Sequence, residues 1–209
     1  MLDFGFYNMD CMDGMKEFPD QFFDLAIVDP PYGINAGRMT MGSGKHIFKN
    51  DKDWDQEIPD KSYFNELFRV SKNQIIFGGN YFTEYLSPSA NWIVWDKMNP
   101  RMSFAEGELA WMRFGDNLRI YSYYTVQAAK KHPKIHPTQK PIELYKWLIN
   151  RYMPGGGACS TRMSVLHHRL SRVANSGSSM LDSKSTKIIS GRQKNGLTPP
   201  KRKRTFLIS

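Results

Sequence analysis

The four residues Asp29, Pro30, Pro31 and Tyr32 are of the types that can hold and orient a weakly nucleophilic amino group. The exocyclic amino nitrogen of a nucleic-acid base is a poor nucleophile, because its lone pair is delocalised into the ring. The Asp29 carboxylate and the Pro30 carbonyl would each accept one N–H and so favour the pyramidal nitrogen that attacks. The two prolines would fix the backbone without adding a competing donor. Tyr32 would offer a face on which an extruded base stacks.

The chain around these residues favours a site over an ordinary turn. Pro-Pro-Tyr-Gly by itself is common in turns and loops, so a plain turn is the alternative interpretation. The preceding run "FFDLAIVD" (22–29) is mostly apolar and ends in an acid, which is typical of a buried parallel strand. Sites on open α/β sheets lie beyond the carboxyl ends of such strands. Asp29 is therefore predicted to face a site.

Strands and helices around this run predict an α/β sheet. Further strands are expected over 73–82, 91–97, 107–115 and 118–125, the last two as an antiparallel pair joined by "GDN". Helices are expected over 60–72, with Asp60 as N-cap, and over 140–153, with Pro141 in the first turn. The stretch 33–59 shows no periodicity and predicts a long loop, and loops of that length are usually functional.

Several segments of the chain, and the order in which they occur, resemble the S-adenosylmethionine-dependent amino-methyltransferases of DNA, which act on adenine N6 or cytosine N4. The family's catalytic motif is Asp, Asn or Ser, then Pro-Pro and an aromatic residue, and the Asp-Pro-Pro-Tyr form found here is commoner among the adenine enzymes. "YNMDCMDGMKEFPDQFFDLAIVDPPYG" (7–33) is similar to the family's opening. "IHPTQKPIELYKWLI" (135–149) is similar to the segment around the methionine end of the cofactor. This order resembles the permuted members, whose glycine-rich cofactor motif follows "HPTQKP".

The resemblance, which spans about residues 5–157, implies a fold, a cofactor and site residues. The implied fold is the Rossmann-like methyltransferase sheet, and the implied cofactor is S-adenosylmethionine. The implied partner is double-stranded DNA with a flipped target base, in a restriction–modification setting. The residues implied for catalysis are Asp29, Pro30, Pro31 and Tyr32. Those implied for cofactor binding are Asp10, His136, Thr138, Gln139, Lys140 and Pro141.

Basic residues in two predicted loops are candidates for contacts to the DNA backbone. They are Arg38, Lys45 and Lys49 in 33–59, and Lys130, Lys131 and Lys134 in 126–139. A solvated loop is the alternative for the first group, because Asp51, Asp53 and Asp55 partly cancel its charge.

Two further motifs are less specific. Gly78, Gly79 and Asn80 would line a base pocket or form a plain strand–turn. Glu106 and Glu108 are predicted to be structural rather than catalytic.

Residues 158–209 differ in composition from the rest of the chain. They hold 11 Lys and Arg against one acid, Asp182, whereas residues 1–157 hold 18 basic and 19 acidic side chains. All the excess positive charge behind the net +9 is therefore in this segment, and every Trp and Tyr lies outside it. Low hydrophobicity with high net charge predicts disorder. We expect a catalytic domain over 1–157 and a disordered basic tail over 158–209.

The cofactor motif that a permuted member should carry after "YMPGGG" is absent from the visible sequence. Its place should hold an apolar strand, a glycine-rich turn and a helix, and an acid about 20 residues later should bind the ribose hydroxyls. Reading the codons one base out of register allows "LDTHVGSASS" at this place and "VGFEID" about 20 residues later. We therefore infer a frameshift near the codons for Gly155–Ala158. A nucleic-acid arm or a targeting signal, as in "PPKRKR" (199–204), is the alternative.

These patterns predict a site-specific DNA methyltransferase that acts on adenine N6. Methylation of cytosine N4 or of an RNA base, and a non-catalytic DNA-binding remnant, are the alternatives. Without the shifted segments we expect a sheet that is incomplete in its cofactor half, with an open edge, negligible cofactor binding and low stability.

The sequence shows no secretory, membrane-spanning or metal-binding pattern. The N-terminus "MLDFGFYNMD" has no signal-peptide pattern, and no apolar run approaches ~18 residues. Cys11 and Cys159 have no metal-ligand spacing. We expect a cytoplasmic protein of bacterial or phage-encoded type, without metal or membrane partner.

Overall fold

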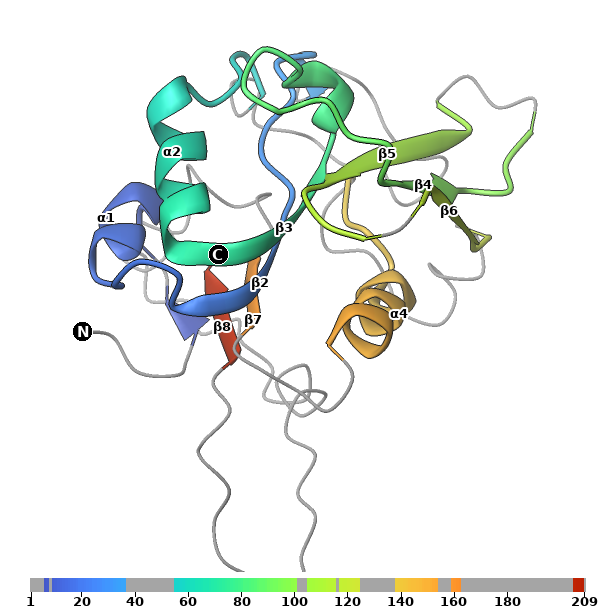
Figure 1. The fold of residues 1–209 in the computed structure, drawn as a ribbon. Helices are drawn as coiled ribbons and strands as arrows, with labels where there is room; N and C mark the ends of the chain where they lie inside the picture. Colours follow the sequence, from blue (N-terminus) through green and yellow to red (C-terminus); the bar gives the residue numbers. More distant parts are fainter. Residues whose placement is uncertain are drawn as a thin grey trace, which may run out of the picture.

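The chain folds into a single sheet flanked by helices (Figure 1). The computed structural model describes residues 6–7, 9–36, 55–100, 105–115, 117–124, 138–153, 159–162 and 205–208. The strands are β1 (Phe6–Tyr7), β2 (Phe23–Val28), β3 (Ser71–Phe77), β4 (Trp92–Asp96), β5 (Gly107–Met112), β6 (Arg119–Ser122), β7 (Cys159–Arg162) and β8 (Thr205–Ile208). The helices are α1 (Cys11–Lys16), α2 (Lys61–Val70), the short 3-10 helix η2 (Gly79–Tyr81) and α4 (Ile142–Tyr152).

The sheet is mostly parallel and confirms the expected α/β class. Its strand order is β1-β8-β7-β2-β3-β5-β4-β6. Every neighbouring pair is parallel except those of β5, which runs antiparallel to both β3 and β4. The carboxyl ends of β2 and β3 therefore meet at one edge of the sheet, where the Asp29 and Gly78 turns begin.

The strands expected over 107–115 and 118–125 run antiparallel, as predicted, but they do not pair with each other. β5 lies between β3 and β4, and β6 pairs instead with the far side of β4, in parallel. The burial of the two strands explains the difference. Ala110, Trp111 and Met112 of β5 are buried, as residues of an interior strand are, whereas β6 alternates between half-buried and exposed residues. A central strand needs partners on both sides, while β6 suits an edge.

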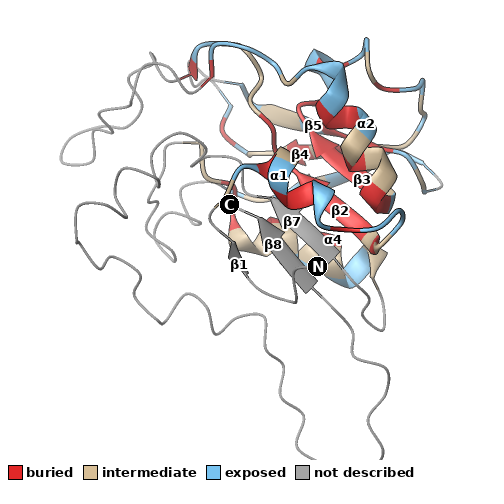
Figure 2. Ribbon diagram, turned by 90° about the vertical axis from the view of Figure 1, so that its left-hand side faces the viewer, coloured by how far each residue is buried: buried red, intermediate tan, exposed pale blue. Residues whose placement is uncertain are grey.

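Two apolar cores lie on opposite faces of the central strands, and β2 and β3 themselves are mostly buried (Figure 2). Ala26 and Val28 of β2 face α1 and α2, whereas Leu25 and Ile27 face α4. This alternation follows from the two-residue period of a strand. It gives three layers, with α1 and α2 on one side of β2 and β3 and α4 on the other (Figure 1).

The predicted helix start signals are confirmed. The Asp60 carboxylate accepts the N–H groups of Ser62 and Tyr63 at the start of α2, which satisfies donors that have no partner inside the helix. Pro141 is the N-cap of α4, where its missing N–H costs nothing.

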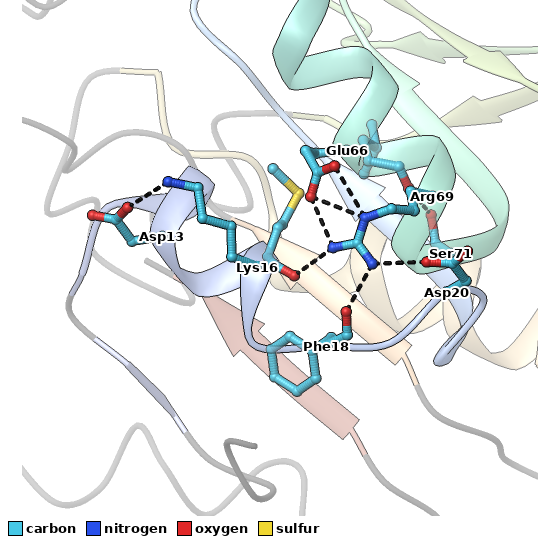
Figure 3. A network of polar contacts seen from close by, with 9 residues as sticks. Asp13, Lys16, Phe18, Asp20, Glu66, Arg69 and Ser71 are labelled. Atoms are coloured by element: carbon cyan, nitrogen blue, oxygen red, sulfur yellow. Dashed lines mark hydrogen bonds and ion pairs between the residues drawn. The ribbon is translucent and has the colours of Figure 1, made fainter.

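Arg69, near the end of α2, joins α2 to α1 and to the turn that precedes β2 (Figure 3). Its guanidinium donates to Glu66 at 2.8 Å and to Asp20 at 2.9 Å. It also donates to the backbone carbonyls of Met15 at 3.0 Å and Phe18 at 2.9 Å. The rigid fork of an arginine suits this task, because its donors point in several fixed directions.

Residues 159–162 and 205–208 are the described parts of the basic segment, and both are strands. β7 pairs in parallel with β2 from Leu25 with Cys159 to Val28 with Arg162, and β8 pairs with β7. The open edge expected beside β2 is therefore wrong, because backbone pairing at an edge needs no particular side chain. The rest of 158–209 lies outside the described residues, so its disorder stays a prediction. Among the described helices, none is long and apolar enough to cross a membrane.

Candidate active site

The segment that follows β2 is held in place by the side chain of Asp55. Oδ1 of Asp55 accepts the backbone N–H groups of Tyr32 at 2.6 Å and Gly33 at 3.0 Å, and Oδ2 accepts that of Ala36 at 2.9 Å. Asp55 itself is buried, and its carbonyl accepts the N–H of Asn35 at 2.8 Å. Gly33 has a φ of 70°, which favours glycine. One carboxylate thus fixes the backbone that carries Tyr32.

Asp29 directly follows the last residue of β2 and is buried, with 7% of its surface exposed. Its Oδ1 accepts the hydroxyl of Tyr32 at 2.6 Å, and its Oδ2 lies 2.6 Å from the Nζ of Lys140. Lys140 also donates to the Tyr32 hydroxyl oxygen at 3.2 Å. Because Lys140 stands just before α4, this contact joins two motifs that are far apart in the sequence. Pro30 is buried beside Asp29, and Pro31 is half-buried.

Lys140 is shared with a second carboxylate, that of Glu108 in β5. Its Nζ lies 3.0 Å from Oε2 of Glu108, whose Oε1 lies 2.8 Å from the Nζ of Lys97. Two carboxylates and two ammonium groups therefore alternate from Asp29 to Lys97. The Lys140 side chain is only 3% exposed, so the solvent does little to screen its charge.

Burial and charge act in opposite directions on these groups. Burial raises the pKa of Asp29 above its ordinary value, although the charge of Lys140 opposes the shift. Burial would also raise the pKa of Glu108, but Lys140 and Lys97 outweigh it and lower that pKa to about 2. Burial disfavours charged Lys140, yet the charges of Asp29 and Glu108 raise its pKa. Burial, followed by the charge of Asp29, raises the pKa of Tyr32, so its hydroxyl remains a donor.

Aromatic rings surround Tyr32. Tyr81 stacks on it, with 5.0 Å between ring centroids and 14° between planes, and Phe82 contacts it at 6.1 Å. Gly78 has a φ of 70°, and a Cβ there would lie 2.2 Å from Cε1 of Tyr32. The glycine at this position therefore makes room for the Tyr32 ring. Gly79 is buried against Trp111, and Asn80 is exposed.

The residues implied for cofactor binding are only partly brought together. Asp10 is exposed and caps the N-terminus of α1, where it accepts the N–H of Met12 at 2.8 Å. Thr138 and Gln139 are half-buried, and Pro141 is buried, in the turn that carries Lys140. His136 lies outside the described residues, as do all the residues predicted to contact DNA: Arg38, Lys45, Lys49, Lys130, Lys131 and Lys134.

Four residues of the site are not found by sequence reasoning, or are given another role by it. Asp55 is among the acids that were expected to offset loop charge, and Glu108 was expected to be structural. Lys97 lies at a strand end that carries no motif, and Tyr81 directly follows the Gly78–Asn80 motif without having been singled out. A signal for Asp55 exists in hindsight: the N–H groups that follow "DPPY" need an acceptor once the turn is buried.

The residues beside β2 do not fit the adenosine half of S-adenosylmethionine. Ribose hydroxyls are usually held by a carboxylate at the end of a strand. β7, which is the strand next to β2, ends on the cation Arg162, and β8 contains no acidic residue. The sequences of these two strands therefore contain no carboxylate that could hold a ribose.

Comparisons with known proteins point to one class of enzyme. The chain is 23% identical over 191 residues to the type II methyltransferase M2.MboI of Moraxella bovis, with 70% of each chain covered. It is 28% identical over 109 residues to the type II methyltransferase M.BamHI of Bacillus amyloliquefaciens, with 52% of this chain and 23% of that protein covered. No protein-family profile matches.

A solved structure, the DNA modification methylase TTHA0409 of Thermus thermophilus, covers 75% of this chain and 78% of its own. It has a TM-score of 0.39 and 15% identity. The similarity to M2.MboI and M.BamHI makes the chain a distant relative of bacterial type II methyltransferases.

Proposed function

We propose that the chain derives from a DNA methyltransferase that modifies adenine N6, and that Asp29, Pro30 and Tyr32 form its base-binding half. The observation that carries this proposal is the position of Asp29. It is buried at the carboxyl end of β2, is followed by two prolines, and is held by Tyr32 and Lys140. The distant similarity to two type II methyltransferases supports the same class of reaction.

The geometry suits the recognition of an amino group. Each oxygen of the Asp29 carboxylate already makes one contact, Oδ1 with Tyr32 and Oδ2 with Lys140. Each oxygen can still accept a further hydrogen bond. An N–H of the base would take one of these places, and the Pro30 carbonyl would accept the other N–H. Holding the nitrogen in this way is catalysis by positioning and by local charge.

An extruded base would meet two aromatic rings. Tyr81 is 42% exposed and stacks on Tyr32, so Tyr32 does not offer both of its faces. We infer that the base stacks on this pair of rings, a contact worth ~1–3 kcal/mol per base in other nucleic-acid sites.

The methyl group would come from S-adenosylmethionine, which supplies a sulfonium-activated methyl when bound. Because the residues beside β2 do not fit its adenosine half, we expect this chain to bind the cofactor negligibly. We expect binding to return when the reading frame is restored near Gly155–Ala158. Isothermal titration of both proteins with S-adenosylmethionine tests this. Equal binding by the two, or a coding sequence in which one base does not restore the glycine turn, would refute the frameshift.

The reaction itself is tested by mass analysis of nucleosides. DNA from a host without methylation is digested after expression of the frame-restored protein. N6-methyladenine is the expected product, and it should be lost in Asp29→Ala but not in Glu84→Gln, an exposed control. N4-methylcytosine would instead support the cytosine alternative, and no methylated base would count against the proposal.

The charge of residues 158–209 favours a second candidate, a non-catalytic DNA-binding remnant. These residues hold 11 Lys and Arg against one acid. Phosphate contacts make DNA binding steeply salt-dependent. Salt-dependent binding that disappears when 158–209 is deleted would support this candidate. Binding that survives the deletion would contradict it.

A further inference from the structure

The charged groups behind Asp29 form a line that leads away from the candidate site. Asp29, Lys140 and Glu108 are joined by contacts of 2.6 Å and 3.0 Å, and Lys97 ends the line at 2.8 Å from Glu108. They come from four places in the fold: the end of β2, the turn before α4, β5, and the residue after β4. Lys140 contacts both carboxylates and so links Glu108 to Asp29, and the charge of Glu108 also acts on Asp29 directly.

The shared ammonium makes Asp29 sensitive to its distant neighbours. Lys140 carries one positive charge and contacts two carboxylates, so whatever attracts it toward Glu108 weakens its hold on Asp29. Lys97 neutralises Glu108 from the other side. The line lies in a region of low exposure, from 3% for the Lys140 side chain to 22% for Glu108, where charges act over longer distances than in water.

We propose that Glu108 and Lys97 are positioning residues that set how much of the Lys140 charge reaches Asp29. Through this division Asp29 remains a carboxylate with room to accept a substrate N–H, rather than one half of a closed ion pair. The substrate part of the inference rests on the proposed function, whereas the coupling between the four groups does not. Among the described residues, the tyrosines Tyr32 and Tyr145 also interact with these carboxylates, and both remain protonated because their pKa is raised well above 10.0.

The coupling predicts opposite responses to two distant substitutions. Glu108→Gln removes a negative charge, so that Lys140 pairs with Asp29 alone. The pKa of Asp29 should therefore fall. Lys97→Met removes the cation that neutralises Glu108, so Lys140 shifts toward Glu108 and the pKa of Asp29 should rise. Each shift should be about half a unit or more, as for charges within ordinary interaction range. Methionine keeps the volume of the lysine stem but removes the ammonium, which lies 5.3 Å from the centroid of the Trp95 ring.

The measurement is a carbon-13 titration of aspartate carboxyl groups in the full chain, with Asp29 assigned by its loss in Asp29→Asn. Glu84→Gln and Lys72→Met make the same charge changes at exposed positions and should not move the Asp29 titration. The double variant Glu108→Gln/Lys97→Met removes one charge of each sign. It should titrate near the wild-type value even where a single variant folds poorly.

Shifts in the same direction, or no shift beyond the controls, would overturn the proposal. A purely structural role for Glu108 and Lys97 would change stability without an opposed pair of shifts. The titration needs neither cofactor nor DNA, so it is independent of methylation. Opposed shifts with no methylated nucleoside would refute the proposed function and leave the coupling supported.

Discussion

Two networks of charged groups, one around Arg69 and one around Lys140, use the same interactions in different surroundings. Arg69 lies on the outside of α2, its side chain is 29% exposed, and Asp20 beside it is 78% exposed (Figure 3). The side chain of Lys140 is 3% exposed and contacts the side chains of Asp29 and Glu108, which are 9% and 22% exposed. Each cation contacts two carboxylates. Arg69 also donates to two backbone carbonyls, whereas Lys140 also donates to the Tyr32 hydroxyl oxygen.

We interpret the Arg69 network as one that holds elements of the fold together, and the Lys140 network as one that sets the charge at the candidate site. Removing the charge of an exposed network costs little, because water replaces the lost partner. Removing one member of a buried network leaves charges that water does not reach. The Lys140 network is therefore the one where substitutions should act strongly, and it lies beside Asp29.

The largest effect is expected for Lys140→Met. It leaves Asp29 and Glu108 buried 2.6 Å and 3.0 Å from a place that no longer holds a cation. Losing one partner of a buried pair typically costs about 3–5 kcal/mol of unfolding free energy, a large share of a total of roughly 5–15 kcal/mol. Urea unfolding at pH 7 measures it.

The control for this variant is Lys146→Met, which lies exposed on the same helix. Its loss should stay within ~0.5 kcal/mol. If Lys140→Met cost no more than Lys146→Met, the buried network would have no special energetic role.

The elements that position this network could largely be predicted from the sequence. The apolar run of β2 and the cap of α2 by Asp60 follow from local rules and are confirmed. The pairing of β5 could not be predicted from the sequence. Only the folded structure shows that β5 pairs with β3 and that Trp111 packs in the core with residues of α2.

A smaller loss is expected for Arg69→Met, of about 1–2 kcal/mol, because its partners are partly exposed and regain water. The carbonyls of Met15 and Phe18 lose their donor, which should loosen α1. Arg69→Lys should recover less than half of the loss, since an ammonium does not reproduce the planar fork. Thermal and urea unfolding test both variants. Full recovery by lysine would show that charge alone is at work.

The distinction between local sequence patterns and contacts that form only on folding also explains which parts of the site could be predicted. Asp29, Tyr32 and Lys140 lie in segments with recognisable order, and the structure brings them within hydrogen-bonding distance. Their roles in catalysis and cofactor binding stay predictions. Asp55, Glu108 and Lys97 carry no local pattern, because each acts on a partner supplied by folding, across 23 residues in the case of Asp55 and Tyr32.

The third prediction concerns stability at low pH, to which Glu108 and Asp29 should contribute with opposite signs. The pKa of Glu108 is lowered from 4.5 to about 2 by its two lysines. Its stabilisation is therefore complete above pH 4.5 and is lost as the pH falls through about 2. The raised pKa of Asp29 costs stability as the pH rises above 3.8.

Glu108→Gln should accordingly flatten the loss of stability between pH 4.5 and 2, measured by guanidinium unfolding at several pH values. Glu66→Gln in the Arg69 network serves as the comparison, since Arg69 also lowers the pKa of Glu66 but is far more exposed than Lys140, at 29% against 3% for the side chains. Salt should weaken the Glu66 contribution more than that of Glu108. Equal salt sensitivity would contradict the contrast between the networks.

The smallest effect is expected for Lys72→Met, which breaks a short ion pair that belongs to neither network. Lys72 Nζ lies 2.7 Å from Asp24, as close as any contact around Lys140 except that to Asp29, yet the two side chains are 50% and 46% exposed. If distance decided the energy, this pair would rank beside Glu108 and Lys140. Because exposure decides it, the loss should stay within ~0.5 kcal/mol at low salt and vanish near ~1 M salt. A loss comparable with that of Lys140→Met would show that burial does not distinguish the charge network behind Asp29 from ordinary surface pairs.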